Sequence, residues 1–136
     1  MIMEKIEAAF HLKAPCHLDA ACHLKAVCHC GNISISAMKL PATVTSCNCS
    51  ICRRYAALWA YYKPADVEVK FLNDESTFYI WGDRELEFHR CVTCGCVTHY
   101  VTTDKFNDPI FAINARMIET EILEAIPVRY ANGAAQ

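Results

Sequence analysis

The sequence lacks long apolar runs, and neither its acidic nor its basic residues gather into a block. Because a transmembrane helix needs about 20 consecutive apolar residues, no segment is predicted to cross a bilayer. The formal charge is −2, from 13 basic and 15 acidic residues, so no surface is expected to attract nucleic acid or a membrane. Residues 1–7 carry acids where a signal peptide would carry a basic start, and we therefore expect a cytoplasmic protein.

The sequence also lacks linker-like or low-complexity stretches that would divide its 136 residues, a length that fits a single domain. Short stretches rich in β-branched residues, or with alternating apolar and polar residues, recur between turn-forming pairs such as Asn73-Asp74 and Gly82-Asp83. This pattern predicts a mainly β domain of short antiparallel strands. Strands are expected over residues 32–37, 40–46, 58–62, 67–72, 77–81, 85–91, 97–102, 110–114 and 127–130, and helical turns only over 52–57 and 118–125.

Residues 11–28 contain three copies of a six-residue repeat, each beginning with His-Leu and ending with Cys. This period is far below the roughly 20–50 residues of a solenoid unit, so the repeat is interpreted as a lead-in to the first strand. We expect residues 1–23 to form an N-terminal extension and residues 24–136 to form one zinc-binding domain. A partly ordered extension is favoured, and the alternative is that Cys16 and Cys22 capture a metal ion together with nearby histidines.

The central motif is Cys47-x-Cys49-x-x-Cys52, and no histidine lies between Cys30 and His89 to complete a local set of four ligands. Thiols this close together chelate an ion more readily than they form long-range disulfides. A zinc ion with three protein ligands keeps its fourth position for water or substrate, as catalytic zinc sites do. The motif therefore predicts an open catalytic zinc site on these three cysteines.

Two further pairs of cysteines each precede a glycine: Cys28 and Cys30 before Gly31, and Cys91 and Cys94 before Gly95. Glycine permits the tight turn in which backbone N–H groups point at the thiolates. We expect the two pairs to form one closed structural zinc site, which gives two Zn²⁺ per chain. The neighbouring Cys96 is interpreted as a buried apolar residue, with the fourth position of the inner zinc as its alternative role.

Four segments together carry a resemblance to a known family. They are C-H-C-G at 28–31, C-x-C-S-x-C-R-R-Y-x-A-L-W-A-Y-Y at 47–62, F-x-x-C-x-x-C-G at 88–95 and A-I-N-A-R-M-I at 112–118. Over about residues 27–130 the chain resembles the glutathione-dependent formaldehyde-activating enzymes, whose family includes centromere protein V-like proteins. The resemblance implies the Mss4-like β-tent fold, with a structural zinc on the outer four cysteines and a catalytic zinc on the inner three. Ala56, where such sequences often carry glycine, departs from the pattern.

The resemblance also implies a carbon–sulfur lyase that joins glutathione and formaldehyde to S-(hydroxymethyl)glutathione, or reverses that reaction. A thiol that coordinates zinc is deprotonated, so glutathione in the open position would present a thiolate at neutral pH. Arg53 and Arg54 are candidates to bind its carboxylates, and solvated surface arginines are the alternative. Trp59 and Tyr61 share one face of a predicted strand and either line a substrate pocket or pack in the core.

Other functions are compatible with part of the pattern. A zinc-stabilised binding module without catalysis would use the same fold, but it would not need an inner site with only three ligands. Redox chemistry at the C-x-x-C of Cys49 and Cys52 is disfavoured because no thioredoxin-like βαβ pattern surrounds it. His89 and His99 are either proton shuttles or hydrogen-bonded structural residues, and the second role is favoured.

Overall fold

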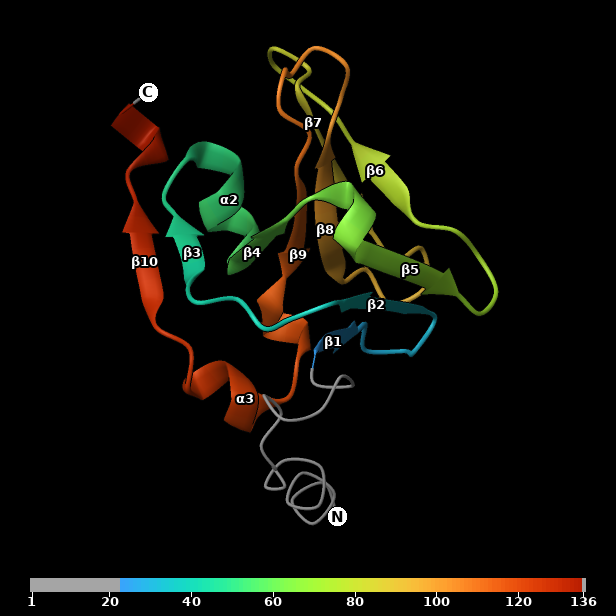
Figure 1. Cartoon of the computed structure of the whole chain (residues 1–136). Coiled ribbons are helices and arrows are strands. Elements are labelled where there is room, and N and C mark those ends of the chain that lie inside the picture. Colours follow the sequence, from blue (N-terminus) through green and yellow to red (C-terminus); the bar gives the residue numbers. More distant parts are fainter. Residues whose placement is uncertain (1–22, 136) are drawn as a thin grey trace.

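A computed structural model describes residues 23–135, and in it the chain forms a mainly β fold with two short α-helices (Figure 1). The strands are β1 (Leu24–Val27), β2 (Ile33–Ala37), β3 (Val44–Cys47), β4 (Trp59–Tyr62), β5 (Val67–Phe71), β6 (Thr77–Tyr79), β7 (Leu86–Arg90), β8 (Val97–Thr102), β9 (Phe111–Asn114) and β10 (Val128–Ala131). The helices are α2 (Ser50–Tyr55) and α3 (Thr120–Glu124), and 3₁₀ turns lie at Pro64–Asp66, Ala115–Met117 and Gly133–Ala135. Within residues 23–135, neither α-helix has the length and apolar character that a membrane-crossing helix needs.

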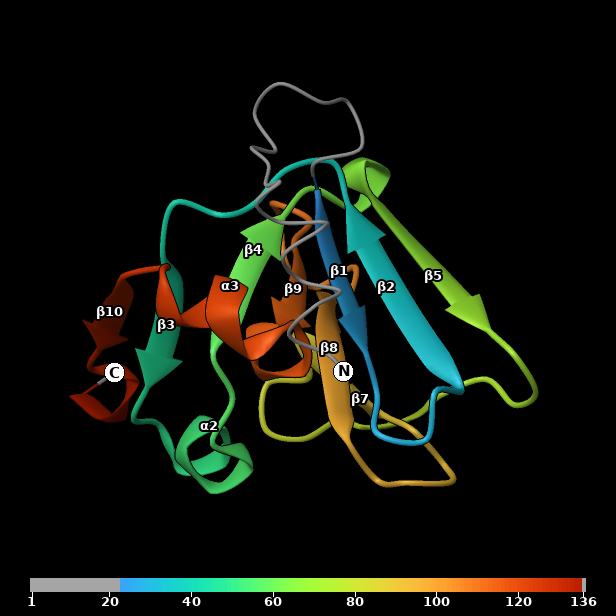
Figure 2. The same ribbon diagram turned by 90° about the horizontal axis from the view of Figure 1, so that it is seen from below.

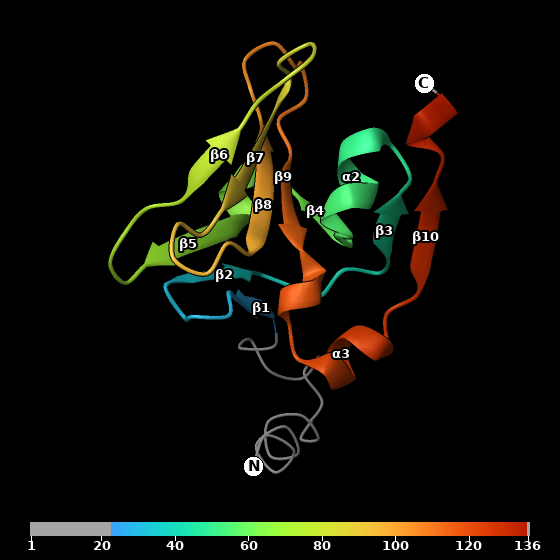
Figure 3. The same ribbon diagram turned by 180° about the vertical axis from the view of Figure 1, so that it is seen from behind.

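The strands form two sheets, a three-stranded one in the order β1-β2-β5 and a seven-stranded one in the order β10-β3-β4-β9-β8-β7-β6. Figure 2 shows the smaller sheet on one side of the molecule and β3 and β10 on the other. In the view of Figure 3, α2 lies beside β3 and β4. Neighbouring strands are antiparallel except β10 and β3, which run parallel. The expected mainly β, largely antiparallel fold is confirmed.

Strand β1 corrects the interpretation of the repeat. The third copy of the six-residue repeat is predicted to lead into the first strand, but residues Leu24–Val27 of that copy are themselves a strand that pairs with β2. Leu24 and Ala26 are fully buried in the core while the residues between and after them are exposed, as the two-residue period of a strand requires. Burial of a leucine side chain stabilises a fold by about 1.5–3 kcal/mol, which gives this copy a role in the core. The first two copies, with Cys16 and Cys22, lie outside the described residues, so the boundary between extension and domain stays a prediction.

The buried residues form two clusters that serve different purposes. The larger cluster joins the two sheets and includes Leu24, Ile33, Ile35, Val44 and Ile113. The smaller cluster lies on the seven-stranded sheet next to α2 and consists of Cys52, Ala57, Trp59, Phe88, Tyr100 and Ala112. Because this second cluster contains one of the central cysteines, the packing of its aromatic rings supports the candidate site directly.

Candidate metal centre and its cavity

The inner triad, which comprises Cys47, Cys49 and Cys52, comes together at the junction of β3 and α2. Cys47 is the last residue of β3, Cys49 is the N-cap of α2, and Cys52 lies within that helix. Their sulfur atoms lie within 4.8 Å of one another, close enough to hold one metal ion. A strand that turns at once into a helix therefore gathers three thiols from a segment of six residues.

Ala56 ends α2 in the left-handed conformation, with φ 55° and ψ 34°, and its N–H donates to the Cys52 carbonyl at 2.9 Å. The left-handed conformation strains any residue with a Cβ by about 1–2 kcal/mol, which explains why glycine suits this position. The Arg116 side chain donates a hydrogen bond to the Ala56 carbonyl. The loop after the triad thus keeps its helix-ending conformation despite the missing glycine.

Cys49 and Cys52 of the inner triad differ in acidity. Trp59 Nε1 donates to Cys52 Sγ at 3.4 Å, but burial still raises the pKa of Cys52 to about 12. Burial also acts to raise the pKa of Cys49, yet the backbone N–H and the thiol of Cys52 outweigh it, so the pKa of Cys49 is lowered. Because metal ligation requires deprotonated sulfur, loading the triad must release the Cys52 proton.

The outer tetrad, which comprises Cys28, Cys30, Cys91 and Cys94, joins two turns that are distant in sequence. Its four sulfur atoms also lie within 4.8 Å of one another, with Cys28 Sγ 3.7 Å and Cys91 Sγ 3.6 Å from Cys30 Sγ. Zinc–sulfur bonds of about 2.3 Å at tetrahedral angles would place neighbouring sulfurs about 3.8 Å apart. The tetrad therefore has the spacing of a closed tetrahedral metal site, and it connects the β1–β2 turn to the β7–β8 turn.

Backbone N–H groups surround the outer tetrad as the glycine turns predict. The N–H of Ile33 donates to Cys28 Sγ at 3.3 Å and that of Thr93 donates to Cys91 Sγ at 3.4 Å. Gly31 and Gly95 have positive φ angles of 86° and 79°, which glycine adopts without strain. These donors offset thiolate charge and favour the metal-loaded form.

Cys96 belongs to the surroundings of the outer tetrad. It precedes β8 and packs half-buried with Cys94 against the larger core cluster. Burial acts to raise the pKa of Cys94, but the backbone N–H groups of Cys96 and Cys30 lower it to about 5. Within residues 23–135, the metal-capable groups comprise the tetrad and the triad without Cys96. Its alternative role as fourth ligand of the inner triad is therefore not supported.

A cavity of about 480 Å³ opens over the inner triad. All three triad cysteines line it, together with a wall of aromatic side chains. The aromatic residues of this wall are Trp59, Tyr61, Trp81, Phe88 and Tyr100. Asp83, from the turn between β6 and β7, is the acidic residue of the lining, and Gly133 reaches it from the C-terminal segment. A thiol or aldehyde in this cavity would have access to the sulfur cluster.

Trp59 and Tyr61 play different parts in the wall. Trp59 is 1% exposed and packs edge-on against Tyr100, with ring centres 4.8 Å apart, so it serves both the core and the cavity. Tyr61 is 41% exposed and lies at the cavity rim. The structure thus places both predicted residues at the cavity, although contact with a substrate stays a prediction.

Arg53 and Arg54 do not line the cavity. Both are exposed on α2, and the Arg54 guanidinium donates to the Ser50 carbonyl of its own helix at 2.8 Å. This placement favours the alternative of surface arginines. Their predicted contact with glutathione carboxylates would need a substrate that extends beyond the cavity.

Sequence reasoning missed the C-terminal segment at the site. Asn48, between two triad cysteines, donates through Nδ2 to Asn132 Oδ1 at 2.9 Å and accepts from the Ala134 N–H at 2.9 Å. These bonds hold Gly133 against the triad: a Cβ on Gly133 would lie 2.6 Å from Cys47 Sγ. Trp81 and Asp83 were missed as well, because the turn signal at Gly82-Asp83 gives no direction for their side chains.

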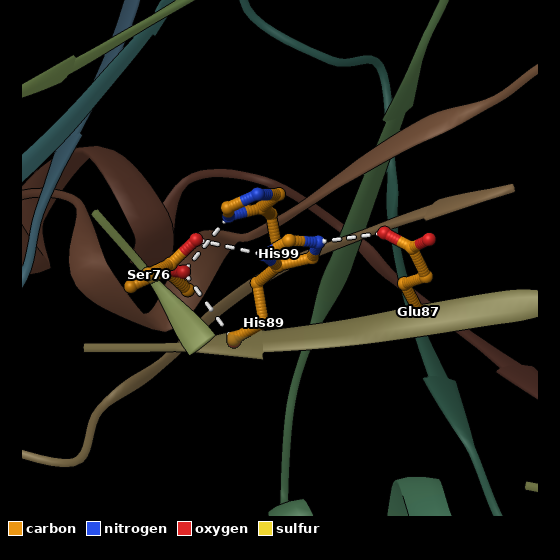
Figure 4. A network of polar contacts seen from close by, with 5 residues as sticks. Ser76, Glu87, His89 and His99 are labelled. Carbon is orange, nitrogen blue, oxygen red and sulfur yellow. Dashed lines mark hydrogen bonds and ion pairs between the residues drawn. The ribbon is translucent and has the colours of Figure 1, made fainter. Parts of the chain in front are cut away.

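His89 and His99 do not line the cavity. Figure 4 shows the two rings with their polar contacts. His89 Nδ1 is 2.7 Å from Ser76 Oγ, and its Nε2 is 3.1 Å from Glu87 Oε1. The two imidazoles stack with centres 4.5 Å apart. Burial, with a smaller effect of His89, lowers the pKa of His99 to about 3, so its ring stays neutral near pH 7. The placement supports structural roles for both histidines.

Comparison with known proteins agrees with the cysteine pattern. The family model described as "Glutathione-dependent formaldehyde-activating enzyme" matches residues 23–128. A crystal structure of a Rhodobacter sphaeroides protein is 29% identical, with a TM-score of 0.63, over 78% of this chain and 100% of that one. A search of curated proteins found no significant match. The family match spans more than half of the chain, which therefore belongs to the glutathione-dependent formaldehyde-activating enzyme family.

Proposed function

We propose that this protein is a zinc-dependent carbon–sulfur lyase or synthase that acts on glutathione–aldehyde adducts, with S-(hydroxymethyl)glutathione as the expected product. The observation that carries this proposal is the difference between the two cysteine groups. The outer tetrad offers four ligands, whereas the inner triad offers three and faces a cavity of about 480 Å³. A substrate thiol can complete a set of three ligands, as at catalytic zinc sites.

The donor sets of both groups fit Zn²⁺, because thiolates at these separations suit its tetrahedral coordination. Zinc on the triad would supply Lewis-acid chemistry that makes a bound thiol lose its proton at neutral pH. Trp59 donates to Cys52 Sγ and so offsets part of the charge of the thiolate cluster. We expect the tetrad zinc to be structural, and a reducing compartment such as the cytoplasm would keep all of these thiols available.

The aromatic wall of the cavity would orient the aldehyde and limit its contact with water. In the addition step, the sulfur of the substrate thiolate forms a bond to the aldehyde carbon, and the carbonyl π electrons move to oxygen. That oxygen takes up a proton, which balances the proton lost by the thiol. Burial raises the pKa of Tyr61, although hydrogen bonds with Thr45 and Tyr100 act to lower it. The Tyr61 hydroxyl therefore stays protonated and can donate a hydrogen bond to the aldehyde oxygen.

The proposal is tested by the exchange of formaldehyde between its free form and the glutathione adduct, followed by NMR at equilibrium. The zinc-loaded protein should accelerate the exchange above its spontaneous rate, and Cys49→Ala should abolish the acceleration. Cys96→Ser, which changes a thiol outside both groups, should retain it. If the wild-type protein left the exchange rate unchanged, the enzymatic function would be wrong and a zinc-stabilised binding module would explain the fold.

A further inference from the structure

The cavity over the inner triad is poorly suited to carboxylates. Its described lining residues include Asp83 but no lysine, arginine or histidine. Three thiolates around one divalent ion leave a net negative charge, and the Asp83 carboxylate adds to it. A ligand carboxylate inside the cavity would therefore meet charge of its own sign, which disfavours binding.

The turn that carries Asp83 is fixed by hydrogen bonds from two directions. The Arg84 N–H donates to the Trp81 carbonyl at 3.0 Å, and Thr103 Oγ1 donates to the Arg84 carbonyl at 2.7 Å. The Glu85 N–H donates to Asp83 Oδ1 at 3.2 Å, so one carboxylate oxygen is oriented by its own turn. Asp83 is exposed, and within residues 23–135 no lysine or arginine forms an ion pair with it.

Aromatic rings face the same space as this carboxylate. Trp81 precedes Asp83 in the turn and is 44% exposed, while Tyr61 and Tyr100 line the cavity from β4 and β8. The negative π face of an aromatic ring attracts a cation, and tryptophan does so most strongly. A carboxylate beside several such rings is the chemistry that recognises an ammonium group.

We propose that the cavity binds the ammonium group of its thiol substrate between Asp83 and the aromatic wall, and therefore selects aminothiols over carboxylate thiols. The inference rests on the proposed function, because the substrate sulfur is taken to complete the inner zinc site. For glutathione, it places the α-ammonium in the cavity and directs the carboxylates toward solvent. A short thiol with an amine and no carboxylate would make both contacts, its sulfur with the inner zinc and its ammonium with Asp83 and the aromatic wall.

The test is isothermal titration of the zinc-loaded protein with three thiols of similar size: 2-aminoethanethiol, 2-mercaptoethanol and 3-mercaptopropionate. The wild-type protein should bind the aminothiol about tenfold more tightly than the neutral thiol, and the carboxylate thiol most weakly. Asp83→Asn should reduce the ratio of aminothiol to neutral-thiol affinity severalfold. Because that ratio is compared between variants, differences in the acidity of the free thiols cancel.

Asp66→Asn is the matched control, because Asp66 lies in the 3₁₀ turn before β5 and does not line this cavity. It should preserve the wild-type ratio. Trp81→Leu should lower the ratio as Asp83→Asn does, since it removes the exposed π face beside the carboxylate. An unchanged ratio in Asp83→Asn, or tightest binding of 3-mercaptopropionate to the wild type, would overturn the inference while leaving the lyase proposal intact. Failure of all three thiols to bind would instead refute the proposed function.

Discussion

Gly133 lies so close to Cys47 that a Cβ added to the glycine would stand 2.6 Å from the Cys47 sulfur and 3.1 Å from the Cys49 Cβ. Such a distance is incompatible with ordinary packing, so a side chain at position 133 must displace either the triad or the C-terminal segment. The segment is held in place by β10, which pairs with β3, and by the side chain of Asn48. The end of the described chain is thus part of the wall of the inner site.

We expect Gly133→Ala to weaken metal binding at the inner triad by at least about tenfold without affecting the outer tetrad, because the added Cβ clashes with Cys47 and Cys49 and with no atom of the tetrad. Competition with a chelator, followed by counting of the retained zinc, measures the two affinities separately. Ala135→Ser changes an exposed neighbour that already has a Cβ and should bind metal as the wild type does. Equal retention of inner zinc in Gly133→Ala and the wild type would show that the close contact is unimportant.

The two cysteine groups should differ in their effect on folding. Cys94→Ser removes a ligand from a site that joins turns 61 residues apart, measured from Cys30 to Cys91, so we expect unfolding or a loss of at least about 4 kcal/mol. Cys49→Ser affects a site contained within one strand–helix junction, and we expect it to cost about 1–2 kcal/mol. Denaturant unfolding of both zinc-loaded variants provides the comparison. Equal losses would contradict the division into structural and catalytic sites.

Ala56 offers a gain in stability. Because it holds a left-handed conformation at the end of α2, Ala56→Gly should stabilise the protein by about 1 kcal/mol, the steric relief less the extra entropy of glycine in the unfolded chain. Ala57→Gly serves as control: Ala57 is buried and has no positive φ, so glycine there should destabilise. A lower midpoint of thermal unfolding for Ala56→Gly than for the wild type would show that the helix end is not strained.

His99 should make stability depend on acidity. Its pKa is about 3 in the folded protein against an ordinary value of 6.5, so between these values the unfolded chain binds the extra proton. The stability that neutral His99 contributes is therefore fully present above pH 6.5 and is lost as the pH falls toward 3. Between pH 7 and pH 5 the wild type should lose about 2 kcal/mol more than His99→Gln, since each unit of pKa shift corresponds to about 1.4 kcal/mol. Parallel pH profiles from chemical denaturation would contradict this role.

Much of the site could be predicted from sequence because its ligands lie in local groups. The triad spans six residues and each half of the tetrad spans three or four, so spacing alone indicated which thiols could meet. The alternation of short strands likewise gave the fold class. The glycine after each cysteine pair then allowed the two distant halves of the tetrad to be paired, the family resemblance implies the same four ligands, and the structure brings those sulfurs together.

The missed features depend on contacts between distant segments. Gly133 reaches the triad because β10 pairs in parallel with β3, with Ala131 opposite Cys47. No local sequence pattern predicts a pairing between strands that lie so far apart in the sequence. Asp83 and Trp81 enter the cavity through a turn whose direction is set by Thr103, on another loop. Strand β1 was not predicted because its residues belong to the third copy of the repeat, which resembles the two copies before it. Each of these was decided by tertiary packing.

The central claim is that the inner triad leaves one metal position open to a substrate thiol while the outer tetrad is complete. It is tested most directly by replacing both zinc ions with Co²⁺ and recording the sulfur-to-metal charge-transfer band as glutathione is added. We predict that the band strengthens by the amount expected for one new sulfur ligand on one ion, that a proton is released, and that Cys52→Ala abolishes both changes. An unchanged spectrum and no proton release at saturating glutathione would show that the fourth position of the triad is closed to thiols, and would contradict the account.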